Sequence, residues 1–291
     1  LGGFLLLNNA LPDRTFSDME NRNLAGKPAL SLGSVFSGRF ESDAESYVTD
    51  QFALRDHWIA LKAYAERLLG KRENNGVYIC SDTLIERIDE PDADRLAANL
   101  SAVNRFAENS AVPVYFTLIP SAAEIWRDKL PAGAPRCDER ALIERLAAET
   151  KADYIDTLSA LSAHSDEALY YRTDHHWTSL GALYGAQALL NGMGIETTLA
   201  ADSAPVRVTD AFYGTLYSRS GARYIQPDGI DVYVPGGEIT VAHIEVEKEV
   251  VTGLYDEEKL AVKDKYAFFM GGNQPLAVVR TGNEGKKLLL I

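Results

Sequence analysis

The feature that most constrains the fold is an alternation of helix and strand patterns in the middle of the chain. Residues 93–109 carry an apolar stripe with helical spacing, and residues 114–119 form an apolar run rich in strand-favouring side chains. A second helical pattern covers residues 138–151 and leads to a short strand pattern at 154–156. Two strands joined through a helix are expected to be parallel neighbours in one sheet that helices cover on both faces. The sequence therefore predicts an α/β fold.

Shorter patterns flank this alternation. Residues 47–69 show a helical stripe with a break near residue 55. Residues 76–80 and 84–88 are expected to pair as a hairpin across a Ser-Asp turn. Strand patterns separated by Pro-Asp-Gly and Pro-Gly-Gly fill the region near 222–262. We expect this region to be a peripheral, antiparallel β-rich insertion, with strands at 224–225, 231–234 and within 239–251.

Residues 170–179 bring acid, imidazole, indole and hydroxyl groups together just before a helical pattern. An Asp and a His two positions apart project to the same side of an extended or turning backbone. Asp174 and His176 can therefore address one cavity, while His175 points elsewhere. The carboxylate would hold the imidazole tautomer and stabilise the imidazolium. The spacing predicts a hydrogen-bonded pair in an open cleft, with His176 as base and Asp174 as its orienter.

The same stretch resembles a known family. Asp174, His175, His176 and Trp177, with residues 170–173 before them, resemble the signature of the bacterial DHHW family. That family is similar to the SGNH-hydrolase-like proteins of alginate and polysaccharide O-acetylation. Further matching stretches are 75–79, 118–123, 212–217 and 271–273. The resemblance runs from Phe16 to the last residue. It implies a three-layer SGNH-hydrolase-like α/β fold with a mainly parallel sheet and helices on both faces.

Several side chains are candidates for the substrate site. Arg172, His175 and Trp177 are candidates because they belong to the motif. Ser121 follows a strand pattern, at the edge of the sheet where ligands of α/β proteins bind, and it either caps the next helix, 122–126, or faces the site.

A glycine turn offers one more candidate. Residues 268–273 end an apolar run on Gly-Gly-Asn, where backbone N–H groups and an amide could stabilise an oxyanion. A tight turn is the alternative interpretation. The SGNH-like relatives use an Asn to polarise the substrate carbonyl, so the resemblance makes Asn273 a candidate.

The expected nucleophile is a serine that the resemblance places outside this sequence. Residues 284–291 have the pattern of a turn that leads into a buried core strand. In the family, such a strand leads directly into a Lys-Asp-Ser-Tyr-like turn with the catalytic serine. The resemblance thus implies an SGNH-like domain over residues 38–291 that is incomplete at its C-terminus. We expect the 291 residues alone to be catalytically silent.

The composition limits the kinds of partner and ligand that the chain is expected to bind. The chain has 42 acidic and 29 basic residues, a net charge of −13, and no basic stripe that could bind nucleic acid. Cys80 and Cys137 fit no zinc site and are expected to be buried thiols, although they could pair in an exported protein. No cofactor and no metal are expected.

The N-terminal residues indicate where in the cell the protein is located. Residues 1–7 form an apolar run too short to span a bilayer, which needs about 20 residues. We interpret the run as the tail of a signal or membrane anchor, with a short buried strand as the alternative. Residues 1–37 are then a membrane-proximal segment and arm, and the protein is expected to be exported and associated with the cell envelope.

Three functions remain open. The first is an acyl esterase or O-acyltransferase acting on a polysaccharide or cell-wall glycan, with a membrane O-acyltransferase as a possible partner. The second is a non-catalytic carbohydrate-binding or scaffold module of an acylation machine. The third is a metal-dependent hydrolase using Asp174, His175 and His176, which would need at least three convergent ligands.

Overall fold

A computed structural model describes most of the chain. The described residues are 8, 10–17, 19–20, 22–196, 204–234, 239–244, 249–282, 284–285 and 287–291. The apolar run at residues 1–7 lies outside them, so its interpretation stays a prediction. Within the described part, no helix is both long and apolar enough to cross a bilayer.

Helices make up the larger share of the regular structure. The α-helices of the described residues are α2 Leu32–Phe36, α3 Arg39–Asp50, α4 Arg55–Leu68, α5 Ala93–Asn109, α6 Ala122–Ile125, α7 Glu139–Glu149, α8 Thr157–Ser162, α9 Ser179–Gly192 and α10 Thr215–Ser220. Short 3₁₀-helices occupy Arg127–Lys129, Glu257–Ala261 and Lys265–Phe268.

The strands are short and fall into five small sheets in the described part of the chain. They are β1 Phe16–Ser17, β2 Arg22–Asn23, β3 Glu73–Asn74, β4 Val77–Cys80, β5 Thr83–Glu86, β6 Tyr115–Phe116, β7 Asp153–Tyr154, β8 Val206–Phe212, β9 Asp228–Val232, β10 Ile239–Ile244, β11 Glu249–Thr252 and β12 Ala277–Thr281.

The central alternation forms as expected, but its strands are shorter than predicted. β6 and β7 pair in parallel, with Tyr115 opposite Asp153, on either side of α7 in the sequence. After Phe116, a side chain takes the place of the backbone hydrogen bonds between the two strands. The Thr117 hydroxyl donates to Ile155 O at 2.8 Å. Every other strand pair in the described residues is antiparallel. The described residues therefore do not form the large, mainly parallel sheet that we expected.

The predicted hairpin β4–β5 lies at the centre of the core. Its register pairs Val77 with Glu86 and Cys80 with Thr83. Successive side chains of β4 point to opposite faces. Tyr78 and Cys80 enter a cluster with α6, α7 and α8, whereas Val77 and Ile79 enter a second cluster with α10. Because both faces are covered, this hairpin joins the two main parts of the core.

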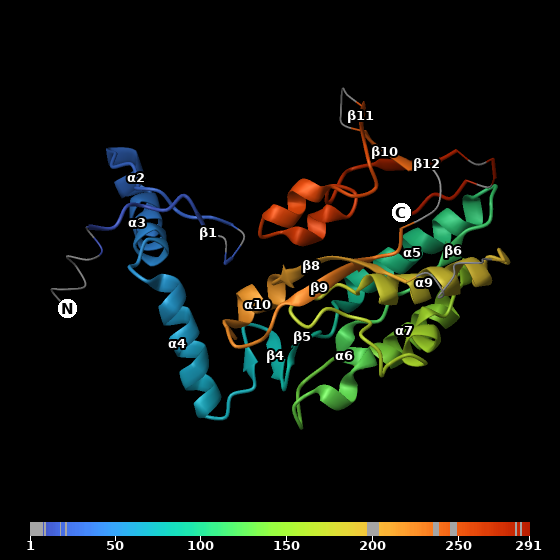
Figure 1. The fold of residues 1–291 in the computed structure, drawn as a ribbon, viewed down its shortest axis with the longest axis horizontal. Coiled ribbons are helices and arrows are strands. Elements are labelled where there is room, and N and C mark those ends of the chain that lie inside the picture. Colours follow the sequence, from blue (N-terminus) through green and yellow to red (C-terminus); the bar gives the residue numbers. More distant parts are fainter. Residues whose placement is uncertain are drawn as a thin grey trace.

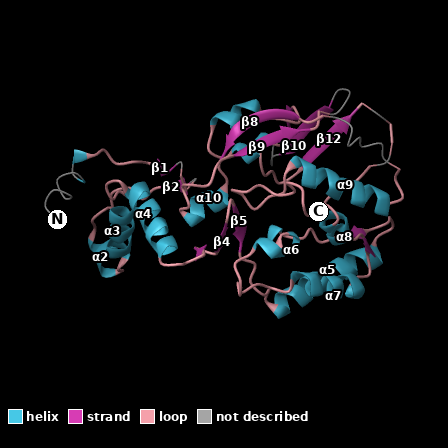
Figure 2. Ribbon diagram, turned by 60° about the horizontal axis from the view of Figure 1, so that its bottom comes forward, coloured by secondary structure: helices cyan, strands magenta, loops and turns pink. Residues whose placement is uncertain are grey.

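The N-terminal helices form a separate end of the molecule (Figures 1 and 2). The predicted helix 47–69 is divided, since α3 ends at Asp50 and α4 begins at Arg55. The break lies at residues 51–54, earlier than expected, because Leu54 adopts a left-handed conformation with φ of 58°. Residues 12–37, expected to be an irregular arm, contain the β1–β2 pair and α2.

The C-terminal part is richer in strands than its sequence pattern indicated. β10 pairs with both β11 and β12, and β8 pairs with β9 across two irregularities. Two expectations are wrong here. Residues 224–225 are not a strand, and residues 288–291 form no strand but are exposed by 60–98%. The tail is exposed because no described element packs against it.

Both cysteines are buried, free thiols, as predicted. Burial is the main cause that raises the pKa of each thiol to about 11. Neither is a thiolate near neutral pH, and thiols of this kind are unreactive.

An ion pair between the exposed Arg22 and the buried Asp50 ties the N-terminal arm to α3. Asp50 accepts hydrogen bonds from Arg22 Nη1 at 2.9 Å and from Ala25 N at 2.8 Å. The hydrogen bond from Arg22 is the main cause that lowers the pKa of Asp50 to about 2.

We expect Asp50→Asn to lower the free energy of unfolding by about 2 kcal/mol at pH 7. A carboxyl with a lowered pKa stabilises the fold above its unfolded pKa, and this contribution is lost as pH falls. The difference between variant and parent should therefore shrink between about pH 4 and pH 2, as measured by urea denaturation. Asp43→Asn, on an exposed position of the same helix, is the control. An equal effect of both substitutions at pH 7 would contradict the assignment.

Candidate active site

The candidate site is built on a tight loop between two short extended segments. Tyr170 and Trp177 form an antiparallel bridge, and Tyr171 N donates to His176 O at 3.1 Å. The next helix, α9, begins after Thr178, whose hydroxyl caps Gly181 N at 3.2 Å. The loop presents the residues between Tyr171 and His176 at its tip, next to the first turn of α10.

Asp174 is the centre of this loop. Its side chain is 3% exposed, and its Oδ1 accepts from His176 Nδ1 at 2.6 Å and from His176 N at 3.0 Å. Its Oδ2 accepts from Thr215 N at 2.7 Å and from the Thr215 hydroxyl at 3.0 Å. Burial alone would raise the pKa of this carboxyl, but the hydrogen bonds from His176 and Thr215 hold it well below its usual range.

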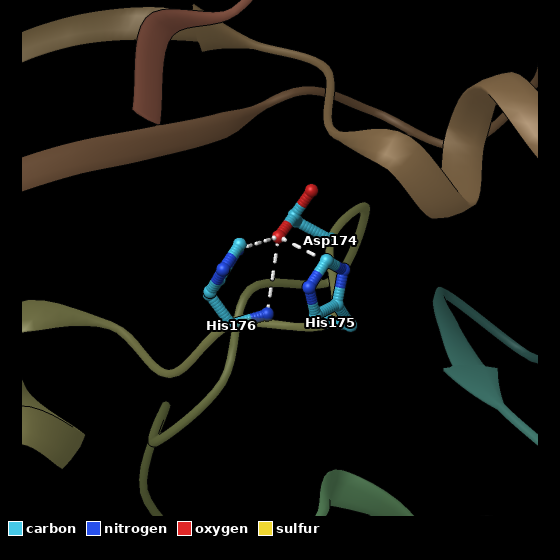
Figure 3. A group of neighbouring side chains, drawn as sticks. All are labelled: Asp174, His175 and His176. Atoms are coloured by element: carbon cyan, nitrogen blue, oxygen red, sulfur yellow. Dashed lines mark hydrogen bonds and ion pairs between the residues drawn. The ribbon is translucent and has the colours of Figure 1, made fainter. Parts of the chain in front are cut away.

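The predicted Asp174–His176 hydrogen bond is thus present (Figure 3). An ionised carboxylate only accepts hydrogen bonds, so Nδ1 of His176 must carry the proton. Nε2 of the neutral ring then holds the lone pair, and none of the described residues is hydrogen bonded to it. This is the arrangement that a general base requires.

The expectation that His175 points elsewhere is wrong. Its Nδ1 lies 3.6 Å from Asp174 Oδ1 and 2.9 Å from the Thr215 hydroxyl. The two imidazole centroids are 4.0 Å apart, so both rings flank one carboxylate (Figure 3). The alternation of an extended strand does not apply, because residues 172–176 bend rather than extend.

A second buried carboxylate holds the loop in place. Asp228, at the start of β9, accepts from Thr173 N at 2.8 Å and from Arg172 N at 3.0 Å. Arg172 also donates through Nη2 to Pro227 O at 2.7 Å. The candidate Arg172 is therefore bound to the β8–β9 pair. The Thr173 hydroxyl is also fully engaged, because it accepts from Gly214 N at 3.0 Å.

An aromatic side chain from the C-terminal part covers His176. The Tyr266 ring, in the 3₁₀-helix Lys265–Phe268, stacks on the imidazole with centroids 3.9 Å apart and an angle of 10°. Burial, followed by the charge of Asp174, raises the pKa of the Tyr266 hydroxyl. One face of the base is closed, so substrate must approach its edge.

A cavity of about 340 Å³ opens beside the two imidazoles. Its wall contains both histidines of the motif, Trp177 and the candidate Ser121. The remaining lining residues are Glu86, Ile88, Ile119, Pro120, Ala122, Ala123, Tyr170 and Leu216. The wall is mostly apolar with a few convergent polar groups, which is typical of a small-molecule site.

Ser121 both caps α6 and lines this cavity, so the two interpretations of the sequence are compatible. Its hydroxyl accepts from Ala123 N at 3.2 Å and donates to Glu139 Oε2 at 2.6 Å. No hydrogen bond joins Ser121 to His176 among the interactions of the described residues. Ser121 is therefore not arranged as the partner of the base.

Trp177 and Asn273 have different surroundings. The Trp177 ring packs so tightly on α9 that a Cβ on Gly185 would come within 2.7 Å of it. Asn273 is exposed and does not line the cavity. The turn before it is tight, with positive φ at Met270, Gly271 and Gly272. The oxyanion role suggested for Asn273 has no support from this placement.

Asp174, His175 and His176 also form a cluster whose potential ligand atoms all lie within 4.8 Å of one another. The two carboxylate oxygens and both Nδ1 atoms already take part in hydrogen bonds. A metal ion could reach the two Nε2 atoms, but a zinc site needs at least three protein ligands. The donor set does not fit a resident metal without rearrangement.

Comparison with known proteins assigns the central part of the chain. Residues 78–216, which include the whole loop and the first two residues of α10, match the family model described as the SGNH hydrolase-like domain of acetyltransferase AlgX. This part is similar to the SGNH hydrolase-like domain of AlgX. The predicted resemblance to this group is confirmed, and the fold is of the SGNH-hydrolase-like α/β type.

Two solved structures have a similar fold. A DHHW family protein from Eubacterium siraeum is 25% identical, with a TM-score of 0.60 over 73% of this chain and 73% of its own. Bacillus cereus PatB1, solved with a sulfonyl adduct, is 20% identical, with a TM-score of 0.53 over 71% of this chain and 73% of its own. No curated protein sequence matches the chain.

Three features of the site were missed from the sequence. Thr215 and Asp228 hold the loop from positions 41 and 55 residues away, and Tyr266 stacks on the base. An Asp at a strand start and a Thr at a helix start are common, so neither gave a signal. Thr215 lies within the matching stretch 212–217, but the resemblance gave it no role.

We expect Gly214→Ala to break the Asp174–His176 hydrogen bond. A Cβ at Gly214 would lie 2.2 Å from Asp174 Cβ and 2.3 Å from its Oδ2, so the carboxylate must move. The low-field proton resonance of His176 Nδ1–H should disappear from the NMR spectrum of the variant. Gly26→Ala, where nothing lies within 4 Å of the added atom, should keep it. A preserved resonance in Gly214→Ala would show that the pair does not depend on this close contact.

Proposed function

We propose that this chain carries the acid–base half of a cell-envelope SGNH-like O-acyltransferase or acyl esterase that acts on a polysaccharide. The observation that carries the proposal is the Asp174–His176 pair beside the cavity, with no described residue hydrogen bonded to Nε2 of His176. In this role, His176 is the base and Asp174 fixes its tautomer. The match to the acetyltransferase AlgX model supports acetyl as the transferred group.

The nucleophile in this proposal is a serine in sequence that follows Ile291. Two observations support it. Nε2 of His176 has no hydroxyl partner among the described residues, and Ser121 is bound to Glu139. The serine would approach the edge of the His176 ring that Tyr266 leaves open.

The proposed setting is the outer face of the cell envelope. Residues 1–37 would tether the domain, the polysaccharide or cell-wall glycan would be the acyl acceptor, and a membrane O-acyltransferase would supply the acyl group. The chain's net charge of −13 is consistent with a partner other than nucleic acid.

A protein that extends beyond Ile291 should react with a sulfonyl fluoride and cleave a model acetyl ester. Sulfonyl reagents modify hydroxyls activated by a base, and PatB1 has been solved with such an adduct. His176→Gln should reduce both reactions about a thousandfold, whereas His57→Gln, on exposed α4, should not. Peptide mass spectrometry should find the label on a serine after Ile291. A label on Ser121 would overturn the assignment, and an inert longer chain would favour a scaffold role.

The protein purified without chelator should contain no stoichiometric zinc. The oxygens of Asp174 and both Nδ1 atoms of the motif are already engaged, so a metal would have to displace these hydrogen bonds. Metal analysis by inductively coupled plasma mass spectrometry measures this directly. One zinc per chain, lost in His175→Phe and His176→Gln, would favour a metal-dependent hydrolase instead.

A further inference from the structure

The hydrogen bonds around Thr215 fix the protonation pattern of the first histidine of the motif. Asp174 is ionised and can only accept, and the Thr215 hydroxyl lies 3.0 Å from its Oδ2. A hydroxyl has one proton, so the proton of Thr215 is used on Asp174. The same oxygen lies 2.9 Å from His175 Nδ1, which must therefore be the donor.

A neutral His175 thus carries its proton on Nδ1 and its lone pair on Nε2. The same is true of His176, whose Nδ1 donates to Asp174 directly. Both rings line the cavity, and no described residue is hydrogen bonded to either Nε2. The site consequently offers two hydrogen-bond acceptors side by side, although a serine hydrolase pair needs only one.

The two rings differ in exposure and in what holds them. Tyr266 stacks on His176, whereas His175 is 41% exposed and has no aromatic cover other than His176 among the described residues. The centroids of the two imidazoles are 4.0 Å apart. A hydroxyl bound to Nε2 of His175 would therefore lie next to the edge of His176 at which the nucleophile is expected.

We infer that Nε2 of His175 is the binding group for a hydroxyl of the acyl acceptor, a neutral sugar. This inference rests on the proposed function and extends it by naming the acceptor position. Thr215 is a positioning residue, because its hydroxyl donates to Asp174 and thereby enforces the tautomer of His175. The arrangement favours transfer to a bound sugar, since His175 selects a group that donates a hydrogen bond.

The tautomer can be tested on the 291 residues themselves by long-range ¹H–¹⁵N NMR of the imidazoles. His175 is expected to be protonated on Nδ1. Thr215→Val keeps the shape but removes the hydroxyl, so the Nε2–H form of His175 should appear while His176 keeps Nδ1–H. Thr215→Ser should restore the parent pattern. Protonation of His175 on Nε2 in the parent protein would overturn the inference.

Binding is tested by titration with methyl β-D-glucopyranoside as the sugar probe. The ¹⁵N shift of His175 Nε2 should change saturably. His175→Phe keeps the ring stack but removes the acceptor, and it should weaken binding about tenfold, read from the Trp177 indole resonance. His57→Phe, on the exposed surface of α4, is the matched control.

Unchanged affinity in His175→Phe, or no saturable shift in the parent protein, would overturn the acceptor role. The two proposals can fail separately. A longer chain could bind the sugar through His175 and yet not be labelled by a sulfonyl fluoride. This result would support the acceptor site and refute the esterase or transferase chemistry.

Discussion

The site depends on one buried carboxylate. Asp174 is almost inaccessible to water, yet it is ionised because four protein donors from His176 and Thr215 replace its hydration. Removing any of these donors would leave a buried charge partly unsatisfied, which costs far more than one exposed hydrogen bond. The local geometry is therefore strict. It explains why position 214 is a glycine, since a side chain there would occupy the space of the carboxylate.

The loop that carries Asp174 is held by a second carboxylate. Asp228 accepts from the backbone of Arg172 and Thr173, and it lies at the start of β9. The two carboxylates thus connect three parts of the chain: the motif loop, the start of α10 and the β8–β9 pair. Such networks rigidify a site when every member is satisfied. The polar groups place His175 and His176 at the cavity, whereas the apolar hairpin β4–β5 packs against α6, whose first residues line the same cavity.

The C-terminal part contributes to the site in a different way. Tyr266 covers one face of His176 by stacking, and the pKa of the nearby Lys263 ammonium is lowered to about 8, first by burial and then by Arg223. Lys263 donates to the carbonyl of Tyr213, one residue before the critical glycine. The segment between the 3₁₀-helices Glu257–Ala261 and Lys265–Phe268 is therefore fastened to the loop before α10. Because Tyr266 covers one face of the His176 imidazole, reacting groups must approach the edge of the ring.

The sequence alone determined the motif, its pairing and the type of fold. Helical and strand periodicity located α5, α7, α9 and the β4–β5 hairpin, because these depend on local patterns of apolar residues. The predicted hydrogen bond between Asp174 and His176 is confirmed. Tertiary structure decided the rest. Thr215, Asp228 and Tyr266 reach the loop from distant segments, and no local pattern specifies such contacts. His175 turned to the same carboxylate because the loop bends, which the strand periodicity could not describe.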